Sequence, residues 1–328
     1  MMLEVWLPLL GGLALLIAGG ELLVRGAVQV ATALGVSPLV IGLTLVGFGT
    51  STPELVTSVQ AALAGAPGIA YGNVVGSNIA NILLIGGIAA LLFPIAVTSA
   101  SLKRDGATML AVAVVFAGAA ALFPLSRALG AAFVLALALY VYMTFRQERA
   151  QSRADHGALY DKNLALQETD PATVPSALPR KPLLVSALIA LGGLALVVLG
   201  GKFLVDGAVS LARGFGISET VIGLTIVALG TSMPELVTSV VAGLKRQGDV
   251  AFGNIVGSNI YNLLGIAGIT ALMAPGPVPQ EIVSFDNLVM LAVSVLLVAV
   301  AWTGLRISRR EGALLLAGYV AYVFVIWP

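Results

Sequence analysis

Two glutamates lie in segments of the sequence that are otherwise apolar. Glu54 belongs to GTSTPELVTS at 49–58, and Glu235 belongs to GTSMPELVTS at 230–239. If these segments cross a membrane, each carboxylate is costly there, and intramembrane carboxylates usually serve a function. The near-identity of the two copies indicates that both glutamates serve the same purpose.

Hydroxyl groups accompany each glutamate at helical spacing. Thr50 and Ser51 precede Glu54 by four and three residues, so an α-helix would place all three on one side. Pro53 has no N–H, and the carbonyl of Gly49 therefore loses its helical donor. In a membrane, such a carbonyl must face protein or a hydrated cavity. The second copy repeats the pattern with Gly230, Thr231, Ser232, Pro234 and Glu235.

A second repeated block supplies amides and further hydroxyls. In GNVVGSNIANIL at 72–83, Asn73, Ser77 and Asn81 are spaced by four residues and predict a polar stripe on one helix. Helix packing is a rival role for these side chains, above all for the first asparagine of each stripe. The matching block, GNIVGSNIYNLL at 253–264, contributes Asn254, Ser258 and Asn262.

The four motif segments offer oxygen ligands only. They contain hydroxyls, amides, carbonyls and carboxylates, and no histidine, cysteine, lysine or arginine. Hard cations such as Ca²⁺ take roughly six to eight oxygens, whereas softer metals call for imidazole or thiolate. Two carboxylates can balance one Ca²⁺ or two monovalent ions. Competition for that charge would couple Ca²⁺ movement to Na⁺ or H⁺ movement.

The composition indicates an all-α membrane protein. Of the 328 residues 59% are hydrophobic and 10% are charged, with a mean hydropathy of +1.02. Apolar runs of roughly 20 residues indicate transmembrane helices, and half of the positions in a membrane β-barrel strand would be polar instead. Ten spans are predicted, near 3–33, 37–64, 69–93, 106–124, 127–146, 182–213, 218–244, 250–273, 284–304 and 311–327.

The spans fall into two halves joined by a polar linker. The first half is 1–146, the linker is 147–181 and the second half is 182–328. We expect the single histidine, His156, to be an ordinary linker residue. Positive residues favour the cytoplasmic side, which predicts a multi-pass protein of the cell membrane with a cytoplasmic linker and both termini outside.

The two halves are an internal repeat. A shift of 181 residues aligns 10–87 with 191–268 without a gap, and about 46 of 78 positions are identical. Because five spans per half is an odd number, the second half must enter the membrane from the opposite side. Inverted repeats of this kind are typical of transporters with a midplane site between the repeats.

The motifs resemble the two α-repeats of the Ca²⁺/cation antiporter superfamily, and most closely its prokaryotic sodium/calcium exchanger branch. The resemblance implies a compact core made of spans two, three, seven and eight, with spans one and six sliding past it. It also implies ligands from the first repeat at Thr50, Ser51, Glu54, Ser77 and Asn81. Those from the second are Thr231, Ser232, Glu235 and Ser258, with carbonyls near Gly49 and Gly230.

One position departs from the family pattern. Exchangers often carry an acidic residue where this sequence has Asn262, whose amide can supply an oxygen but cannot titrate. Asparagine at this position is similar to the proton/calcium branch, whereas GTSxPE favours the sodium branch. Exchange of Ca²⁺ for Na⁺ is predicted on that motif, with exchange of Ca²⁺ for H⁺ as the alternative. A cation channel is a more remote alternative, because the duplicated site is complete in one chain. We expect no enzymatic activity, no cofactor and no nucleic-acid partner.

Overall fold

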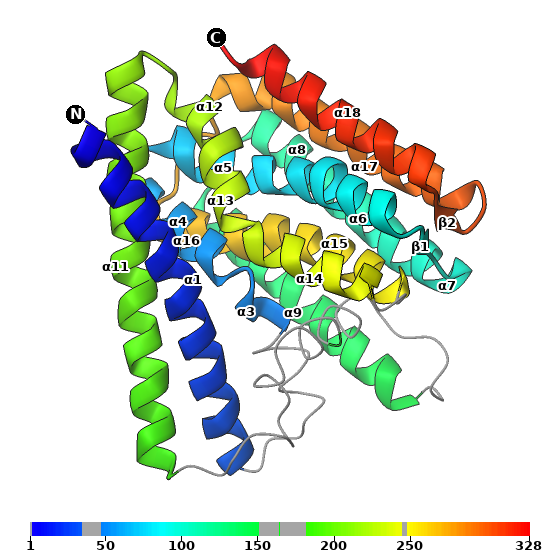
Figure 1. Cartoon of the computed structure of the whole chain (residues 1–328), viewed down its shortest axis with the longest axis horizontal. Helices are drawn as coiled ribbons and strands as arrows, with labels where there is room; N and C mark the ends of the chain where they lie inside the picture. The colour runs from blue at the N-terminus through cyan, green and yellow to red at the C-terminus, as the bar shows by residue number, and fades with distance from the viewer. Residues whose placement is uncertain (1, 35–46, 151–163, 165–181, 245–247) are drawn as a thin grey trace.

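The computed structural model describes residues 2–34, 47–150, 164, 182–244 and 248–328, most of which are helical (Figure 1). In this part of the chain, seven helical segments are long and apolar enough to cross a membrane, or up to eight if one bent pair counts as a span. The only strands described are β1 (Ile95–Ala96) and β2 (Arg306–Ile307). The prediction of an α-helical membrane protein is confirmed at this level.

Two long helices, α1 (Met2–Ala33) and α11 (Leu183–Phe215), pack side by side and antiparallel (Figure 1). Glycines at intervals of seven residues allow this close contact. A Cβ added to Gly193 would lie 2.2 Å from the backbone nitrogen of Leu23, and one added to Gly200 would lie 2.7 Å from that of Leu16. The full set is Gly12, Gly19 and Gly26 on α1 with Gly193, Gly200 and Gly207 on α11.

Each GTSxPE motif forms a broken helix. Helix α3 (Gly47–Gly49) is followed by α4 (Thr52–Leu63), and Ser51 between them has φ −86° and ψ 9°. In the second half, Ser232 has φ −84° and ψ 8°, and the segments on its two sides differ in direction by 48°. Those segments are α12 (Glu219–Ile222), η5 (Gly223–Val227) and α13 (Ala228–Thr231) before the break, and α14 (Met233–Leu244) after it.

These breaks follow from the prolines that the sequence places two residues after Ser51 and Ser232. A proline removes a helical donor and its ring crowds the preceding turn. The predicted distortion near Pro53 and Pro234 is therefore confirmed. The start of the predicted second span, residues 37–46, lies outside the described residues.

The two asparagine-rich motifs form long buried helices, each containing a π-helical turn. The first runs through α5 (Pro67–Ala80), the π-turn η2 (Asn81–Ile85) and α6 (Gly86–Leu92). The second runs through α15 (Gly248–Tyr261), the π-turn η6 (Asn262–Ile266) and α16 (Ala267–Met273). Every described residue from 68 to 83 is buried, as is every one from 251 to 268.

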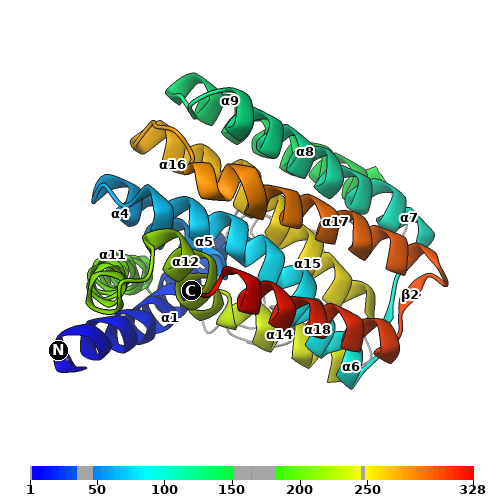
Figure 2. The same cartoon turned by 90° about the horizontal axis from the view of Figure 1, so that it is seen from above.

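The remaining helices flank this core in rows that run roughly parallel to it (Figure 2). Of the predicted linker, residues 147–150 extend α9 beyond the expected end of span five, and Leu164 packs on the core. The rest of the linker, with His156, lies outside the described residues. The flanking helices are α7 (Ser99–Ser101), η3 (Leu102–Gly106), α8 (Ala107–Leu122), α9 (Arg127–Ala150), η7 (Ile282–Asp286), α17 (Asn287–Trp302) and α18 (Arg309–Ile326).

Contacts between the halves occur in matching pairs at opposite ends of the core. Ile95 pairs with Ile307 in the β1–β2 ribbon, and the repeat-equivalent bridge joins Leu125 to Gly276. The first residue of α9, Arg127, donates to the carbonyl of Leu272 at 3.2 Å. The first residue of α18, Arg309, donates likewise to the carbonyl of Leu92 at 3.1 Å. The same local structures thus recur in both halves.

Candidate cation site

The two motif glutamates are buried, and each accepts a hydrogen bond from a serine of the opposite half. Ser51 Oγ donates to Glu235 Oε1 at 3.0 Å, and Ser232 Oγ donates to Glu54 Oε1 at 3.0 Å. Glu54 is 1% exposed and Glu235 is 2% exposed. The two carboxylates therefore belong to one site formed by both broken helices.

Two asparagines hold the broken helices against the buried ones. Asn73 Nδ2 donates to the carbonyl of Glu54 at 3.2 Å and to Ser58 Oγ at 2.9 Å. Asn254 Nδ2 makes the equivalent bonds to the carbonyl of Glu235 at 3.1 Å and to Ser239 Oγ at 2.8 Å. The Asn73 and Asn254 amides thus fix the glutamate backbones, which favours the packing role considered for them from the sequence.

The two threonines of the site differ in their contacts. Thr231 Oγ1 donates to Asn73 Oδ1 at 3.0 Å and to the carbonyl of Val227 at 3.1 Å. In the repeat-equivalent pair, Thr50 Oγ1 and Asn254 Oδ1 are buried and have no hydrogen-bond partner within the described structure. The two halves are therefore joined through Thr231 and Asn73 but not through Thr50 and Asn254.

The asparagines at the start of the π-turns present free oxygens. Asn81 Nδ2 donates to Asn259 Oδ1 at 3.1 Å, which orients the Asn81 side chain. The Oδ1 atoms of Asn81 and Asn262 are buried, and neither has a hydrogen-bond partner among the described residues. A buried acceptor without a donor is unfavourable, and a bound cation would satisfy it. Single π-turns are common at functional sites.

The other predicted site residues lie at the same place in the fold. Ser77 Oγ donates to Asn73 Oδ1 at 3.4 Å, and Ser258 is fully buried on the matching helix. Gly49 is the last residue of α3, and Gly230 is the next-to-last residue of α13, just before the second break. A Cβ added to Gly49 would lie 2.3 Å from Val24 Cγ2, whereas one added to Gly230 would be 3.5 Å from Leu13 Cδ1. Helix α1 therefore packs beside both breaks.

Two contributors to the site are absent from the sequence prediction. Tyr261 stacks on Phe48, next to Gly49, with ring centroids 4.4 Å apart. Asn259 orients Asn81. Asn259 belongs to the repeated GSN tripeptide, which could have identified it, whereas Tyr261 stands where the first repeat has Ala80.

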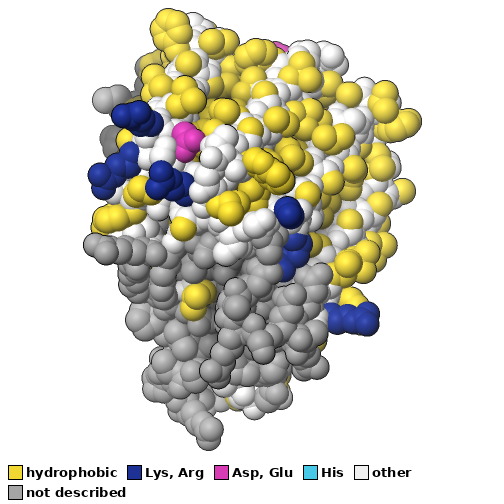
Figure 3. Space-filling view, turned by 90° about the vertical axis from the view of Figure 1, so that its right-hand side faces the viewer, with side chains coloured by type: hydrophobic (Ala, Val, Ile, Leu, Met, Phe, Trp, Pro, Cys, Tyr) yellow, Lys and Arg dark blue, Asp and Glu magenta, His cyan; other side chains and the backbone are white. Residues whose placement is uncertain are grey.

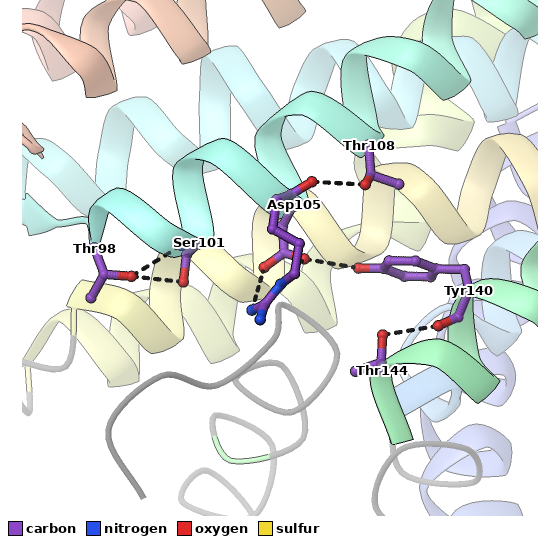
Figure 4. A network of polar contacts seen from close by, with 7 residues as sticks. Thr98, Ser101, Asp105, Thr108, Tyr140 and Thr144 are labelled. Atoms are coloured by element: carbon purple, nitrogen blue, oxygen red, sulfur yellow. Dashed lines mark hydrogen bonds and ion pairs between the residues drawn. The ribbon is translucent and has the colours of Figure 1, made fainter. Parts of the chain in front are cut away.

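A separate polar network lies at the end of the molecule near α7 (Figure 4). The buried Asp105 carboxylate receives Nε and Nη2 of Arg104, both at 3.1 Å, and the hydroxyl of Tyr140 at 3.5 Å. In the other half, the repeat-equivalent carboxylate of Asp286 accepts from Tyr322 at 2.8 Å. These contacts join the fourth and fifth helices of each half. The hydrophobic pattern of the sequence did not reveal them.

The central site contains the kinds of ligand that a hard cation takes. Its described side chains offer carboxylate, hydroxyl and amide oxygens, which Ca²⁺ and Na⁺ both accept. Among the described residues, no three His, Cys, Asp or Glu side chains converge. A cation at this site would therefore combine two carboxylates with neutral oxygens.

Comparisons with known proteins agree with this chemistry. The family model described as "Sodium/calcium exchanger protein" matches residues 4–146 and again residues 185–327. Sodium/calcium exchanger MaX1 of Methanosarcina acetivorans is 37% identical, over 98% of each chain. Inner membrane protein YrbG of Escherichia coli is 35% identical, over 97% of this chain and 95% of its own. Structures of the sodium-calcium exchanger NCX_Mj soaked with Na⁺ and Sr²⁺ match with a TM-score of 0.62 and 30% identity over 99% of both chains.

Proposed function

Because this chain belongs to the sodium/calcium exchanger family, we propose that it is an antiporter that exchanges Ca²⁺ for Na⁺ across a membrane. The single observation that carries the proposal is the pair of buried glutamates joined across the two halves, Ser51 to Glu235 and Ser232 to Glu54. One site with a formal charge of −2 can hold one Ca²⁺ or be neutralised by monovalent ions. Because Ca²⁺ and the monovalent ions cannot occupy the site at the same time, the movement of one is coupled to the movement of the other.

The ligands that we propose come from both repeats. The glutamates supply the charge, and serine, threonine and asparagine side chains supply neutral oxygens. The unpartnered Oδ1 atoms of Asn81 and Asn262 support ligation by these two amides. The full proposed set is Gly49 and Gly230 through their carbonyls, with Thr50, Ser51, Glu54, Ser77, Asn81, Thr231, Ser232, Glu235, Ser258 and Asn262 through their side chains.

The proposed architecture is ten transmembrane helices in two inverted five-helix repeats, 1–146 and 182–328, joined by a linker. The matching bridges at Ile95–Ile307 and Leu125–Gly276 support a twofold relation, because equivalent contacts lie at opposite ends of the core. Helix α18 begins with Arg309, Arg310 and Glu311, and its apolar length follows them. In this arrangement α1 and α11 move past the broken helices to expose the site to each side in turn.

The proposed location is the cell membrane, with the linker in the cytoplasm and both termini outside. A complete site within one chain means that a monomer is sufficient for exchange. No cofactor is required, since the transported ions supply the driving force.

The site has only two carboxylates, and this number bears on which ion is exchanged for Ca²⁺. Asn262 cannot take up a proton, so exchange with H⁺ would have to rely on Glu54 and Glu235 alone. Exchange with Na⁺ needs only oxygen ligands, which the asparagines provide. Family membership and the oxygen-rich site both favour Na⁺ as the counter-ion.

Radiolabelled Ca²⁺ uptake into proteoliposomes tests the proposal. Vesicles containing the purified protein are loaded with Na⁺, or acidified without Na⁺, and diluted into choline buffer. Uptake only from Na⁺-loaded vesicles is the expected result. Uptake driven by the pH gradient alone would assign exchange of Ca²⁺ for H⁺ instead. Single-channel currents in planar bilayers would contradict antiport altogether.

A further inference from the structure

The end of the molecule that bears β2 and α7 carries several Lys and Arg side chains next to apolar ones (Figures 1 and 3). Three arginines fall within five residues there: Arg306, Arg309 and Arg310. All three side chains are exposed. In the described part of the chain, none of them forms a salt bridge. The ion-exchange site does not use them.

Comparison of the two halves shows which of the three arginines has a structural role. Arg309 donates to the carbonyl of Leu92 near the end of α6, as Arg127 does to the carbonyl of Leu272 near the end of α16. One arginine at the start of the last helix therefore has the same structural role in both halves.

Arg306 and Arg310 have no arginine at the equivalent positions of the first half. Counted from the shared arginine, Arg306 corresponds to Pro124 and Arg310 corresponds to Ala128. The bridge between Leu125 and Gly276 forms without any arginine at these two positions. The local fold thus does not require Arg306 or Arg310, and their charges call for another explanation.

The backbone under these arginines is well fixed. Arg306 pairs with Ala96 in the β1–β2 ribbon, and the N–H of Val97 donates to the carbonyl of Leu305 at 2.9 Å. Glu311 is the nearest acidic residue in the sequence. Its Oε2 accepts the N–H of Ser308 at 2.6 Å and its Oε1 accepts the hydroxyl of Thr303 at 3.2 Å. Its carboxylate serves the helix cap and also offsets part of the charge of Arg306, and with three arginines against one glutamate the segment from 306 to 311 keeps a net positive charge.

An exposed aromatic residue precedes Arg306 by four positions in the sequence. Trp302 is the last residue of α17 and is 62% exposed. Tryptophan at the end of a membrane helix prefers the level of the lipid headgroups. Arginine binds phosphate oxygens through two parallel N–H groups, and basic residues at this level attract anionic lipids.

We propose that Arg306 and Arg310, beside Trp302, bind the phosphate of an anionic phospholipid. The positive charge selects the anionic headgroup over a zwitterionic one, and Trp302 packs against the upper acyl chain. A soluble phosphate presents the same oxygens but has no acyl chain to contact Trp302.

Fluorescence quenching of Trp302 tests this site. The chain contains three tryptophans, and W6F/W327F leaves Trp302 as the only one. W6F/W302F leaves only Trp327, which follows the C-terminal end of α18, far from the arginines at its start, and serves as the matched control. Both proteins are reconstituted with brominated phosphatidylglycerol or with brominated phosphatidylcholine, each diluted in unlabelled phosphatidylcholine. We expect phosphatidylglycerol to quench Trp302 more strongly than phosphatidylcholine, and both to quench Trp327 equally.

Charge removal should abolish the difference. In R306Q/R310Q, the preference of Trp302 for phosphatidylglycerol should fall roughly tenfold or more. R127Q, which removes the exposed arginine of the other corner, should leave the preference unchanged. Equal quenching by both lipids in the parent protein would overturn the proposal. So would an undiminished preference in R306Q/R310Q, as expected if the arginines serve only to orient the chain during insertion.

Two further measurements distinguish the sources of phosphate and guard against misfolded variants. Inorganic phosphate added to the vesicles should not relieve the excess quenching, and relief would assign the site to a soluble phosphate instead of a lipid. Native mass spectrometry of the full chain with all three tryptophans should show phosphatidylglycerol retained by the parent and lost in R306Q/R310Q. Equal retention by both proteins would contradict the proposal.

Discussion

Ser51 donates a hydrogen bond to Glu235 across 184 residues of sequence, with 3.0 Å between Oγ and Oε1. The reciprocal bond from Ser232 to Glu54 has the same length. These two bonds connect the helix break of each half to the carboxylate of the other. A change on either side should therefore affect the whole site.

The serines offer the first prediction. Ser51→Ala and Ser232→Ala should each lower the free energy of unfolding by about 1.5–3 kcal/mol, because a hydrogen bond to a charged acceptor is lost. Ca²⁺ affinity should fall to a similar extent in both variants. Thermal unfolding and Ca²⁺ titration of the purified proteins measure these effects. Ser284→Ala, at an exposed serine, is the control, and an unchanged Ser51→Ala protein would contradict the prediction.

A second prediction separates the two asparagines of the π-turns. Asn262→Asp adds a carboxylate where Oδ1 has no partner in the described structure, so Ca²⁺ affinity should rise roughly tenfold or more. Asn81→Asp adds the same charge but removes the amide that donates to Asn259. It should lower the free energy of unfolding by about 1–3 kcal/mol. Equal stability of the two variants would argue against this assignment of the amides.

The threonines provide a third test, since only one of them has a partner. Thr231→Val removes the bond to Asn73 and should destabilise the protein by about 1 kcal/mol. Thr50→Val removes a hydroxyl that bonds to nothing in the described structure, and stability should not fall. Both variants should bind Ca²⁺ more weakly, because both lose a proposed ligand. Unimpaired Ca²⁺ binding by Thr50→Val would remove that residue from the ligand set.

The contact between α1 and α11 supports a fourth prediction from two adjacent glycines. A Cβ at Gly193 would lie 2.2 Å from the backbone nitrogen of Leu23, whereas nothing lies within 4 Å of a Cβ at Gly192. Gly193→Ala should therefore cost about 1–3 kcal/mol, because the helices must separate. Gly192→Ala should be neutral or slightly stabilising. Thermal unfolding compares them, and equal melting temperatures would refute the close contact.

The sequence was sufficient to predict the helical class, the breaks and most of the candidate site. Prolines in repeated apolar segments identify the breaks, and the spacing of Thr50, Ser51 and Glu54 places their side chains on one side of a helix. The repeat also implies that any contact between the halves should occur twice, as the serine–glutamate bonds do.

Other features depend on tertiary packing and could not be predicted. The π-turns at Asn81 and Asn262 leave no mark in the hydrophobic pattern, because their helices are buried on all sides there and have no exposed face whose spacing could change. The stacking of Tyr261 on Phe48 depends on how two helices from different halves pack. The difference between Thr231 and Thr50 is also invisible in sequence, since the two motifs are nearly identical there.

Na⁺-driven Ca²⁺ uptake by Glu54→Gln and Glu235→Gln in proteoliposomes is the most direct measurement of the central claim. Loss of one unit charge about 4 Å from the ion costs about 4 kcal/mol or more, roughly a thousandfold in affinity. Each variant should therefore fold and reconstitute like the parent but show no exchange, while Glu281→Gln, at an exposed glutamate, keeps full uptake. Undiminished exchange in either buried-glutamate variant would contradict a shared site built on both carboxylates.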